Sequence, residues 1–361
     1  MKKACTIGSA TSDIFLLYQG TDVLDIHQKE NVRSYMLLEK GVKVDIPKIQ
    51  VGPGGGATNV AVVLSRLGIS VTPFFKTGDD EAGKMIRSTL EQENITTQFC
   101  PLDTQYDTAF TIIIPSLEKD HAALCYRSAN LYQSMQQFPL SLLKELDLLF
   151  IGPLSGASKE MLQPLVDAAY NEGVPSACNP GLSQLTEKTV PFIEALKKID
   201  TVIVNTRESG FLMQRLLEEP ESPLFVTSSS VPHLLQEYIH FGSRYFTINE
   251  VARTILDHGP QTLVITNGSE GVYVITKEKI YFHPSIPSSP VSSLGAGDAF
   301  SSAFLGARLQ ERSIQEALRY GVMNATSVLS YPDAQKGLLR SSTLQEQSQK
   351  ISLSVVMEFP L

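Results

Sequence analysis

The feature that most constrains this chain is an alternation of short apolar runs with longer amphipathic stretches. Apolar runs at Leu146–Ile151, Ser176–Asn179 and Thr201–Asn205 each precede a segment with helical periodicity. The last predicted helix, over 313–330, begins with the capping box Ser313-x-x-Glu316. Such alternation is typical of a mostly parallel sheet with helices on both faces. The sequence therefore predicts an α/β, doubly wound fold.

Two stretches, 14–50 and 97–128, break this alternation because they contain strands and no convincing long helix. We expect them to pair with each other as a small side sheet. A third stretch, 218–252, begins with the acidic and proline-broken run Glu218–Pro223 and is expected to be a surface insertion. The chain has no internal repeat or low-complexity tract, and residues 1–361 are predicted to form one domain.

Composition excludes several classes of protein. The chain has 30 Lys and Arg against 38 Asp and Glu, a net charge of −8, so no nucleic-acid partner is expected. The four cysteines form no CxxC, which argues against a disulfide scaffold and a cysteine zinc site. They favour a reducing compartment, and a cytoplasmic location is expected. The start of the chain has no sustained apolar run before Asp13, so no signal peptide is expected. No window approaches the ~18 apolar residues of a membrane-spanning helix, so no membrane partner is expected.

Two glycine-rich segments each come directly before a predicted helix. They are GPGGGATN (52–59) and LGAGDAF (294–300). The first N–H groups of a helix lack partners and carry partial positive charge, and glycine lets an anion approach them closely. Either segment alone can also be a tight turn without a ligand. Neither matches the P-loop or the dinucleotide-binding pattern GxGxxG.

Asp298 lies inside the second glycine-rich segment, where its charge would oppose a bound phosphate. Two interpretations stay open from the spacing alone. An aspartate near a helix N-terminus can cap the helix. It can also act as a general base that takes a proton from an attacking hydroxyl, while neighbouring amides stabilise the transferred group.

The order and separation of GGGATNVAVVLSRLG (54–68) and SSLGAGDAFSSAFL (292–305) resemble those of the ribokinase-like (PfkB) family of carbohydrate and nucleoside kinases. Four shorter features of the chain also resemble motifs of this family: Asp13 after the first strand, TGDDEAG (77–83), NTRE (205–208) and TNGSEG (266–271). The resemblance covers essentially the whole chain, with 218–252 the least matched part. It implies a ribokinase-like body with a small β-sheet lid, and a kinase that uses ATP and Mg²⁺ to phosphorylate a hydroxyl group.

The resemblance also implies roles for individual residues around the nucleotide. Asp298 would be the general base, and an anion hole would form from the amides of Gly295, Ala296 and Gly297. The nucleotide site would be lined by Thr266, Gly268, Gly271 and, near the adenine, Asn324. Mg²⁺ would be held through water by Asn205 and Glu208.

On the acceptor side, the resemblance implies contacts between substrate hydroxyls and Asp13, Gly55, Gly56 and Asn59. Arg127 and Asn130, at the end of the second side-sheet stretch, could also reach the substrate. Outside the family context, Asp13 would be assigned to a turn and Asn59 to an exposed helix face. Arg127 could equally be solvated.

The chain departs from the family pattern at three places. Ala177–Gly181 lacks the Asp and Arg of the family's D-x-N-x-R motif, and Ser292-Ser293 stands where many members have D-T. These losses put a monovalent-cation site in doubt. Gly56 occupies a position at which members acting on phosphorylated sugars often carry lysine, so an unphosphorylated acceptor is expected.

Three functions remain open from the sequence. The first is an ATP-dependent kinase of a free sugar or sugar acid, which the polar residues Arg127 and Asn130 favour. The second is a nucleoside (adenosine-type) kinase, whose acceptor needs an apolar or aromatic slot. The third is a non-catalytic sugar or nucleotide sensor, which predicts damage at Asp298, Asn205 or Glu208. A homodimer paired through the lid is expected, because small sheets have exposed edges and one apolar face.

Overall fold

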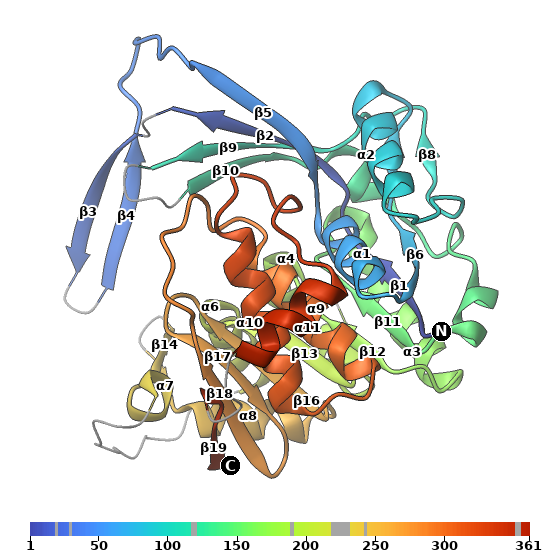
Figure 1. The fold of residues 1–361 in the computed structure, drawn as a ribbon, viewed down its shortest axis with the longest axis vertical. Coiled ribbons are helices and arrows are strands. Elements are labelled where there is room, and N and C mark those ends of the chain that lie inside the picture. The colour runs from blue at the N-terminus through green and yellow to red at the C-terminus, as the bar shows by residue number, and fades with distance from the viewer. Residues whose placement is uncertain are drawn as a thin grey trace.

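A nine-stranded sheet forms the centre of the molecule in a computed structural model that describes residues 1–18, 21–28, 31–116, 121–187, 191–217, 232–241, 244–350 and 355–361 (Figure 1). From one edge to the other its strands are β6 (Ser70–Phe74), β1 (Lys3–Ile7), β11 (Leu148–Ile151), β12 (Ser176–Cys178), β13 (Thr201–Asn205), β16 (Thr262–Asn267), β17 (Gly271–Ile275), β18 (Lys279–Pro284) and β19 (Met357–Pro360). The strands from β6 to β16 pair in parallel, whereas those from β16 to β19 pair antiparallel. The predicted mostly parallel sheet is confirmed.

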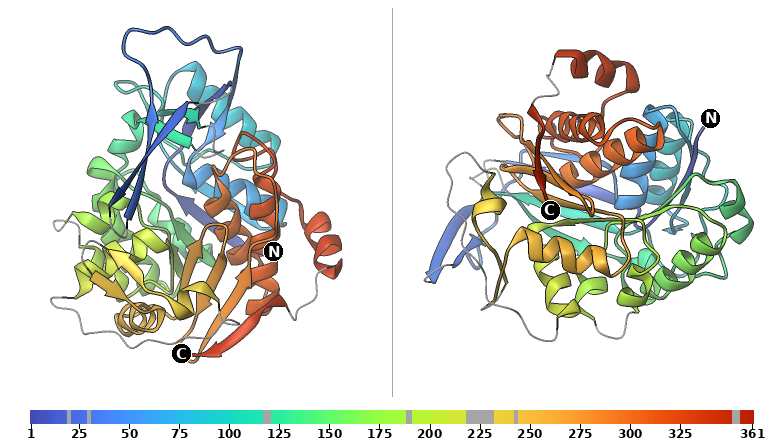
Figure 2. Two further views of the ribbon diagram at one scale, coloured as in Figure 1. Left: turned by 90° about the vertical axis from the view of Figure 1, so that its left-hand side faces the viewer. Right: turned by 90° about the horizontal axis from the view of Figure 1, so that it is seen from below.

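Helices cover both faces of this sheet, because successive strand side chains point to opposite sides (Figure 2). Leu149 and Ile151 pack into one core, while Phe150 between them packs into the other. The first core is covered by α3 (Leu162–Asn171), α5 (Phe192–Leu196), α6 (Thr206–Leu216) and α8 (Ile248–Asp257). The second is covered by α1 (Gly56–Arg66), α2 (Glu81–Gln92), α9 (Ala296–Leu309), α10 (Ile314–Val328) and α11 (Ser341–Lys350).

Shorter elements connect these layers. They are β7 (Thr77–Gly78), β8 (Leu102–Asp103), α4 (Leu182–Thr186) and the 3₁₀ turns η1 (Ser128–Tyr132), η2 (Leu140–Glu145) and η3 (Gly156–Met161). The predicted capping box is present at the start of α10, where the Glu316 N–H donates to Ser313 Oγ at 3.2 Å. In the part of the chain that the structure describes, no helix is both long and apolar enough to cross a membrane.

A separate four-stranded sheet, the lid, lies over one end of the body (Figure 1). Its strands, in order, are β10 (His121–Tyr126), β9 (Phe110–Pro115), β2 (Thr11–Leu17) and β5 (Lys48–Gly54). β2 and β9 pair in parallel, so the predicted pairing between the stretches 14–50 and 97–128 is confirmed. β3 (Asp22–Gln28) and β4 (Asn31–Leu37) form a two-stranded ribbon that extends away from the body.

Two local expectations differ from the structure. Asp13 does not lie in a turn, because β2 begins at Thr11 and pairs Asp13 with Gly52 of β5. The expected insertion 218–252 includes 218–231 and 242–243, which lie outside the described residues. Its remainder forms α7 (His233–Gln236), β14 (Ile239–Phe241), β15 (Arg244–Phe246) and the start of α8. Val251 and Ala252 on α8 are fully buried, so this end of the stretch belongs to the core.

The entry to α1 depends on a backbone conformation that favours glycine. Gly55 has a φ of 100°, and a Cβ there would lie 2.4 Å from the carbonyl oxygen of Ser9. Gly68, after the same helix, has a φ of 82°, but a Cβ there would meet nothing within 4 Å.

We predict that Gly55→Ala lowers the free energy of unfolding by about 3 kcal/mol or more, and Gly68→Ala by about 1 kcal/mol. Urea denaturation measures both losses, and equal losses would contradict the importance of the Ser9 contact.

Candidate active site

The two glycine-rich segments meet in space. Asn59, in the first turn of α1, donates from Nδ2 to Oδ2 of Asp298, in the first turn of α9, at 2.9 Å. Asn59 is only 4% exposed, so it does not lie on an exposed helix face. This contact joins residues that are 239 positions apart in the chain.

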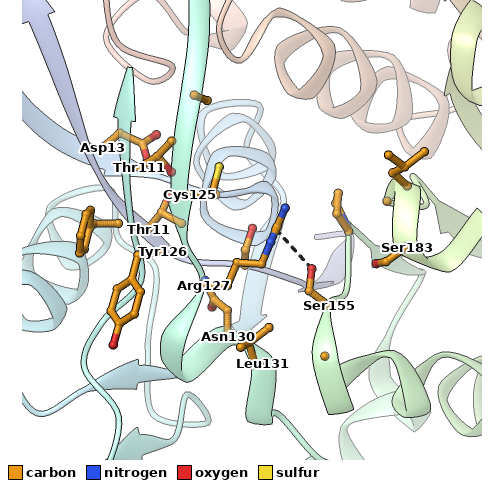
Figure 3. Close-up of a pocket in the computed structure, with 18 of the residues that line it drawn as sticks. Thr11, Asp13, Thr111, Cys125, Tyr126, Arg127, Asn130, Leu131, Ser155 and Ser183 are labelled. Carbon is orange, nitrogen blue, oxygen red and sulfur yellow. Dashed lines mark hydrogen bonds between the residues drawn. The ribbon is translucent and has the colours of Figure 1, made fainter. Parts of the chain in front are cut away.

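A pocket of about 740 Å³ lies between the lid and the body, within the volume range of small-molecule sites (Figure 3). Its lid side includes Asp13 from β2 and Thr111 from β9. Its body side includes Ser155, after β11, and Asp298 of α9. The pocket therefore contains the predicted base and the predicted acceptor-binding aspartate.

The carboxylate of Asp13 is 5% exposed and faces this pocket. Burial raises its pKa from 3.8 to about 6, although the hydroxyls of Thr11 and Thr111 lower the pKa in part and the charge of Asp298 raises it further. Its Oδ1 atom is buried and has no hydrogen-bond partner among the described residues. A Cβ on Gly54 would lie 1.9 Å from the Oδ2 atom, so glycine is needed beside this carboxylate.

Asp298 is positioned by the start of α9. Gly295 adopts the left-handed conformation with a φ of 76°, and the helix begins at the next residue. Burial raises the pKa of Asp298, while the hydrogen bond from Asn59 opposes that rise. Because the side chain reaches across to Asn59, it does not cap its own helix, and the capping interpretation is not supported.

The N-terminus of α9 fits an anionic group such as a nucleotide phosphate. The first N–H groups of a helix lack intrahelical partners. A Cβ on Gly297 would meet nothing within 4 Å, so the side-chain position of this glycine faces open space. The Ala296 N–H makes only a long 3.4 Å contact with the Ser293 carbonyl. The anion hole at Gly295, Ala296 and Gly297 stays a prediction, and this helix N-terminus is the place in the structure where it would form.

The residues expected to bind the acceptor have different surroundings. Arg127 is exposed, lines the pocket and donates to Ser155 Oγ at 3.3 Å (Figure 3). Asn130 also lines the pocket, but both ends of its amide bond to the backbone of Ala10, at 3.2 and 2.9 Å. Its side chain therefore holds the β1–β2 connection, and the expected contact with the acceptor is not supported. Gly55 lines the pocket, whereas the Gly56 N–H is taken by Ser9 Oγ at 3.1 Å.

The motifs expected to hold the nucleotide and metal lie together at the ends of β13 and β16. Asn205 is paired in register with Thr266. The Thr206 hydroxyl donates to Asn267 Oδ1 at 2.8 Å, which joins the two motifs. Gly268 and Gly271 flank the turn after β16, and neither lines the pocket that contains Asp298.

Asn324 does not fit the expected contact with adenine. It is fully buried on α10, its Nδ2 donates to the Ala299 carbonyl, and its Oδ1 accepts from the Leu339 N–H, both at 2.8 Å. Both ends of the amide are therefore occupied between α9, α10 and the segment that precedes α11.

Asn205 and Glu208 form a reciprocal capping box at the start of α6. The Glu208 N–H donates to Asn205 Oδ1 at 2.8 Å, and the Asn205 N–H donates to Glu208 Oε2 at 2.9 Å. Direct ligation of a metal through these two oxygens would break the cap, whereas the expected contact through water would preserve it. Among the described residues there is no group of three or more His, Cys, Asp and Glu side chains that could hold a metal ion.

Two residues around the site could not be identified from the sequence. Thr111 faces the pocket because it is paired with Asp13 across β2 and β9, a register that the sequence does not reveal. Gln335 donates from Nε2 to Asn59 Oδ1 at 2.9 Å, although it lies outside every motif considered above. Only the three-dimensional structure brings these side chains to the site.

Comparison with known proteins assigns the family. Residues 20–340 match the family described as pfkB family carbohydrate kinase. A ribokinase of Haemophilus influenzae is 27% identical over 306 residues, covering 82% of this chain and 87% of that protein. A 5-dehydro-2-deoxygluconokinase of Halalkalibacterium halodurans is 22% identical over 315 residues, covering 83% and 87%. The chain belongs to the pfkB family of carbohydrate kinases, which are phosphotransferases with an alcohol group as acceptor.

Solved structures agree on the fold. The Arabidopsis thaliana ribokinase complexed with ribose and ATP has a TM-score of 0.72 at 18% identity, covering 98% of this chain and 100% of that chain. A Burkholderia thailandensis nucleoside kinase in complex with inosine has a TM-score of 0.72 at 15% identity, covering 96% and 98%. The predicted ribokinase-like fold and carbohydrate-kinase class are confirmed.

The raised pKa of Asp13 predicts how stability changes with pH. The folded protein retains a proton on Asp13 that the unfolded chain releases, so stability falls as pH rises from 3.8 to about 6. We predict that Asp13→Asn removes this fall and stabilises the free protein by about 2–3 kcal/mol at pH 7, while it weakens acceptor binding. Urea denaturation at several pH values measures the effect, with Asp25→Asn on the exposed ribbon as control. A variant that follows the wild-type pH dependence would contradict the burial of this charge.

Proposed function

We propose that this protein is an ATP-dependent kinase that transfers the γ-phosphoryl group to a hydroxyl of a free sugar or sugar acid. One observation carries the proposal: Asp298, at the N-terminus of α9, shares a pocket with the buried carboxylate of Asp13. ATP, when bound, supplies an electrophilic phosphoryl group that needs positioning and charge stabilisation more than covalent catalysis.

In this proposal, different residues of the chain bind the acceptor, remove its proton and stabilise the transferred group. Asp13, whose Oδ1 has no partner among the described residues, accepts hydrogen bonds from acceptor hydroxyls. Asp298 takes the proton of the attacking hydroxyl, which its raised pKa favours. The amides of Gly295, Ala296 and Gly297 stabilise the charge on the transferred group. Thr266, Gly268 and Gly271 contribute to the nucleotide site.

Among the possible acceptors, a sugar acid is favoured by the position of Arg127 in the pocket. Arg127 is the only cationic side chain among the described residues that line the pocket, and it reaches toward Ser155 (Figure 3). A guanidinium binds a carboxylate with two parallel hydrogen bonds. The similarity to a 5-dehydro-2-deoxygluconokinase supports the same choice.

A nucleoside acceptor is the second candidate. The rings of Phe110 and Tyr126 lie 5.1 Å apart at the pocket wall and provide an aromatic surface for a base. The sensor alternative has less support, because Asp298, Asn205 and Glu208 are all present.

The proposal also covers the metal ion, the domain organisation and the location of the protein. Mg²⁺ would contact Asn205 and Glu208 through water, with the capping box intact. Residues 1–361 would act as a single kinase domain with its lid. A cytoplasmic location is proposed from the four cysteines, all of which are free thiols.

Asp298→Asn tests the assignment of the general base. Asparagine keeps the shape of the side chain but cannot accept the proton. We predict that kcat falls about 10²- to 10⁴-fold, while the affinity for ATP changes less than about twofold. Steady-state kinetics and calorimetric titration with ATP measure the two effects. If kcat stays near the wild-type value, Asp298 is not the base.

We also propose that two chains pair through their lids. Leu124 lies between Ala123 and Cys125, which line the pocket, so it points to the opposite face of the lid and is 57% exposed. On the ribbon, Leu24 and Leu37 are each 47% exposed. A two-stranded ribbon with exposed apolar side chains is marginal alone, and a second lid would cover both surfaces.

Analytical ultracentrifugation tests this pairing. We predict that the wild-type protein sediments at twice 39.6 kDa at micromolar concentration, and that Leu124→Glu shifts it toward the monomer. Gln345→Glu, at an exposed position on α11, is the control, because it also adds one negative charge. Wild-type protein that sediments only at 39.6 kDa would exclude the lid dimer.

A further inference from the structure

A chain of buried polar side chains continues from Asp298 into the body, away from the pocket. Asn59 donates to Asp298 from its Nδ2, and its Oδ1 accepts from Gln335 Nε2, each at 2.9 Å. Asn59 is 4% and Gln335 6% exposed, so water has little access to either amide. Both polar ends of Asn59 are therefore assigned to fixed partners.

This arrangement determines which way the Asn59 amide faces. An amide has one accepting and one donating end, and only the donating end stabilises a carboxylate. If Asn59 turned over, its oxygen would face the oxygens of Asp298. Gln335 prevents this, because its N–H occupies the oxygen of Asn59 on the far side.

The turn that carries Gln335 is itself fixed to the lid. Asp333 Oδ1 accepts the N–H groups of Gln335 and Lys336, at 3.1 and 2.7 Å. Asp333 Oδ2 accepts from Gln50 Nε2 at 2.5 Å. Gln50 lies on β5, two residues before Gly52, the partner of Asp13 in the lid. A continuous set of hydrogen bonds thus runs from the lid to Asp298.

We propose that Gln335 is a positioning residue, which fixes the Asn59 amide and through it the carboxylate of Asp298, and that Asp333 connects this contact to lid strand β5. The inference rests on the proposed function, because it concerns the base of that reaction. Gln335 does not touch the pocket, so it acts only through Asn59.

Other charged groups near Asp298 have to be separated from this effect. Asp13 on β2, Arg127 after β10 and Glu187 after α4 line the same pocket. His121 on β10 contacts Ser293, in the loop that precedes α9, at 3.2 Å. None of these groups is changed by a substitution at Gln335.

The test follows the titration of Asp298 itself. Carboxyl ¹³C NMR of the full-length protein labelled at aspartate reports its pKa, and the signal is assigned by its absence in Asp298→Asn. We expect Gln335→Met and Gln335→Glu each to raise the Asp298 pKa by about one pH unit, because Asn59 is then free to turn. The methionine variant adds no charge, so a rise there cannot come from repulsion. Gln345→Met, exposed on α11, is the control and should leave the titration unchanged.

Kinetics provide the second readout. We expect both Gln335 variants to lose about tenfold or more in kcat at pH 7, with the KM for ATP within about twofold of wild type. Gln50→Met should raise the KM for the acceptor several-fold, with a smaller change in the Asp298 titration. A purely structural role for Gln335 would lower the melting temperature and leave the titration unchanged, which would overturn the proposal. Wild-type protein that phosphorylates no acceptor would instead reject the proposed function, and the titration would still decide the role of Gln335.

Discussion

The hydrogen bond between Asn59 and Asp298 is the contact on which the rest of the site depends. It joins the first turn of α1, which follows the lid strand β5, to the first turn of α9, which presents the amides expected to bind phosphate. A buried carboxylate is costly unless it is hydrogen-bonded. Here the asparagine N–H and the partial positive charge of the α9 N-terminus both favour the ionised form. Burial acts in the opposite direction, and the balance leaves Asp298 with a raised pKa.

The lid adds a second carboxylate in a different environment. Asp13 is held against Thr11 and Thr111 and has a pKa of about 6, raised mainly by its burial. Two carboxylates that face one pocket from different elements can take different tasks, one binding hydroxyls and one removing a proton. This separation depends on the lid, because β2 carries Asp13 and β5 must place Gly54 beside it.

Much of the fold could be predicted from the sequence, because the alternation of apolar runs and amphipathic helices is a local signal. The pairing of the two lid stretches was also predicted, because both contain strands and no convincing long helix. The expected surface insertion 218–252 extends too far along the chain. Its acidic, proline-broken start at Glu218–Pro223 is not typical of a core segment, whereas the apolar spacing of Ile248, Val251 and Ala252 near its end belongs to the buried helix α8.

The site was predictable where a motif is contiguous and unpredictable where it depends on side-chain partners. Asp13, Asn59 and Asp298 were chosen from their motifs, and the structure brings them to one pocket. The amides of Asn59, Asn130 and Asn324 were assigned to ligands, but both ends of each amide bond to other groups of the protein. Asn59 bonds to the side chains of Asp298 and Gln335, whereas Asn130 and Asn324 bond to the backbone. Which partner an amide takes is decided by tertiary contacts, and the residue type alone does not reveal it.

The most direct test of the account is ³¹P NMR of the protein with ATP and a panel of free pentoses, hexoses, sugar acids and nucleosides. The account predicts that at least one sugar or sugar acid is converted to a phosphate monoester, with one ADP formed for each ester. If calorimetry detects binding of ATP and of an acceptor, yet no ester forms with any member of the panel, the pocket binds its ligands without transferring a phosphoryl group. That result would contradict the central claim that Asp298 acts as a base on a bound hydroxyl.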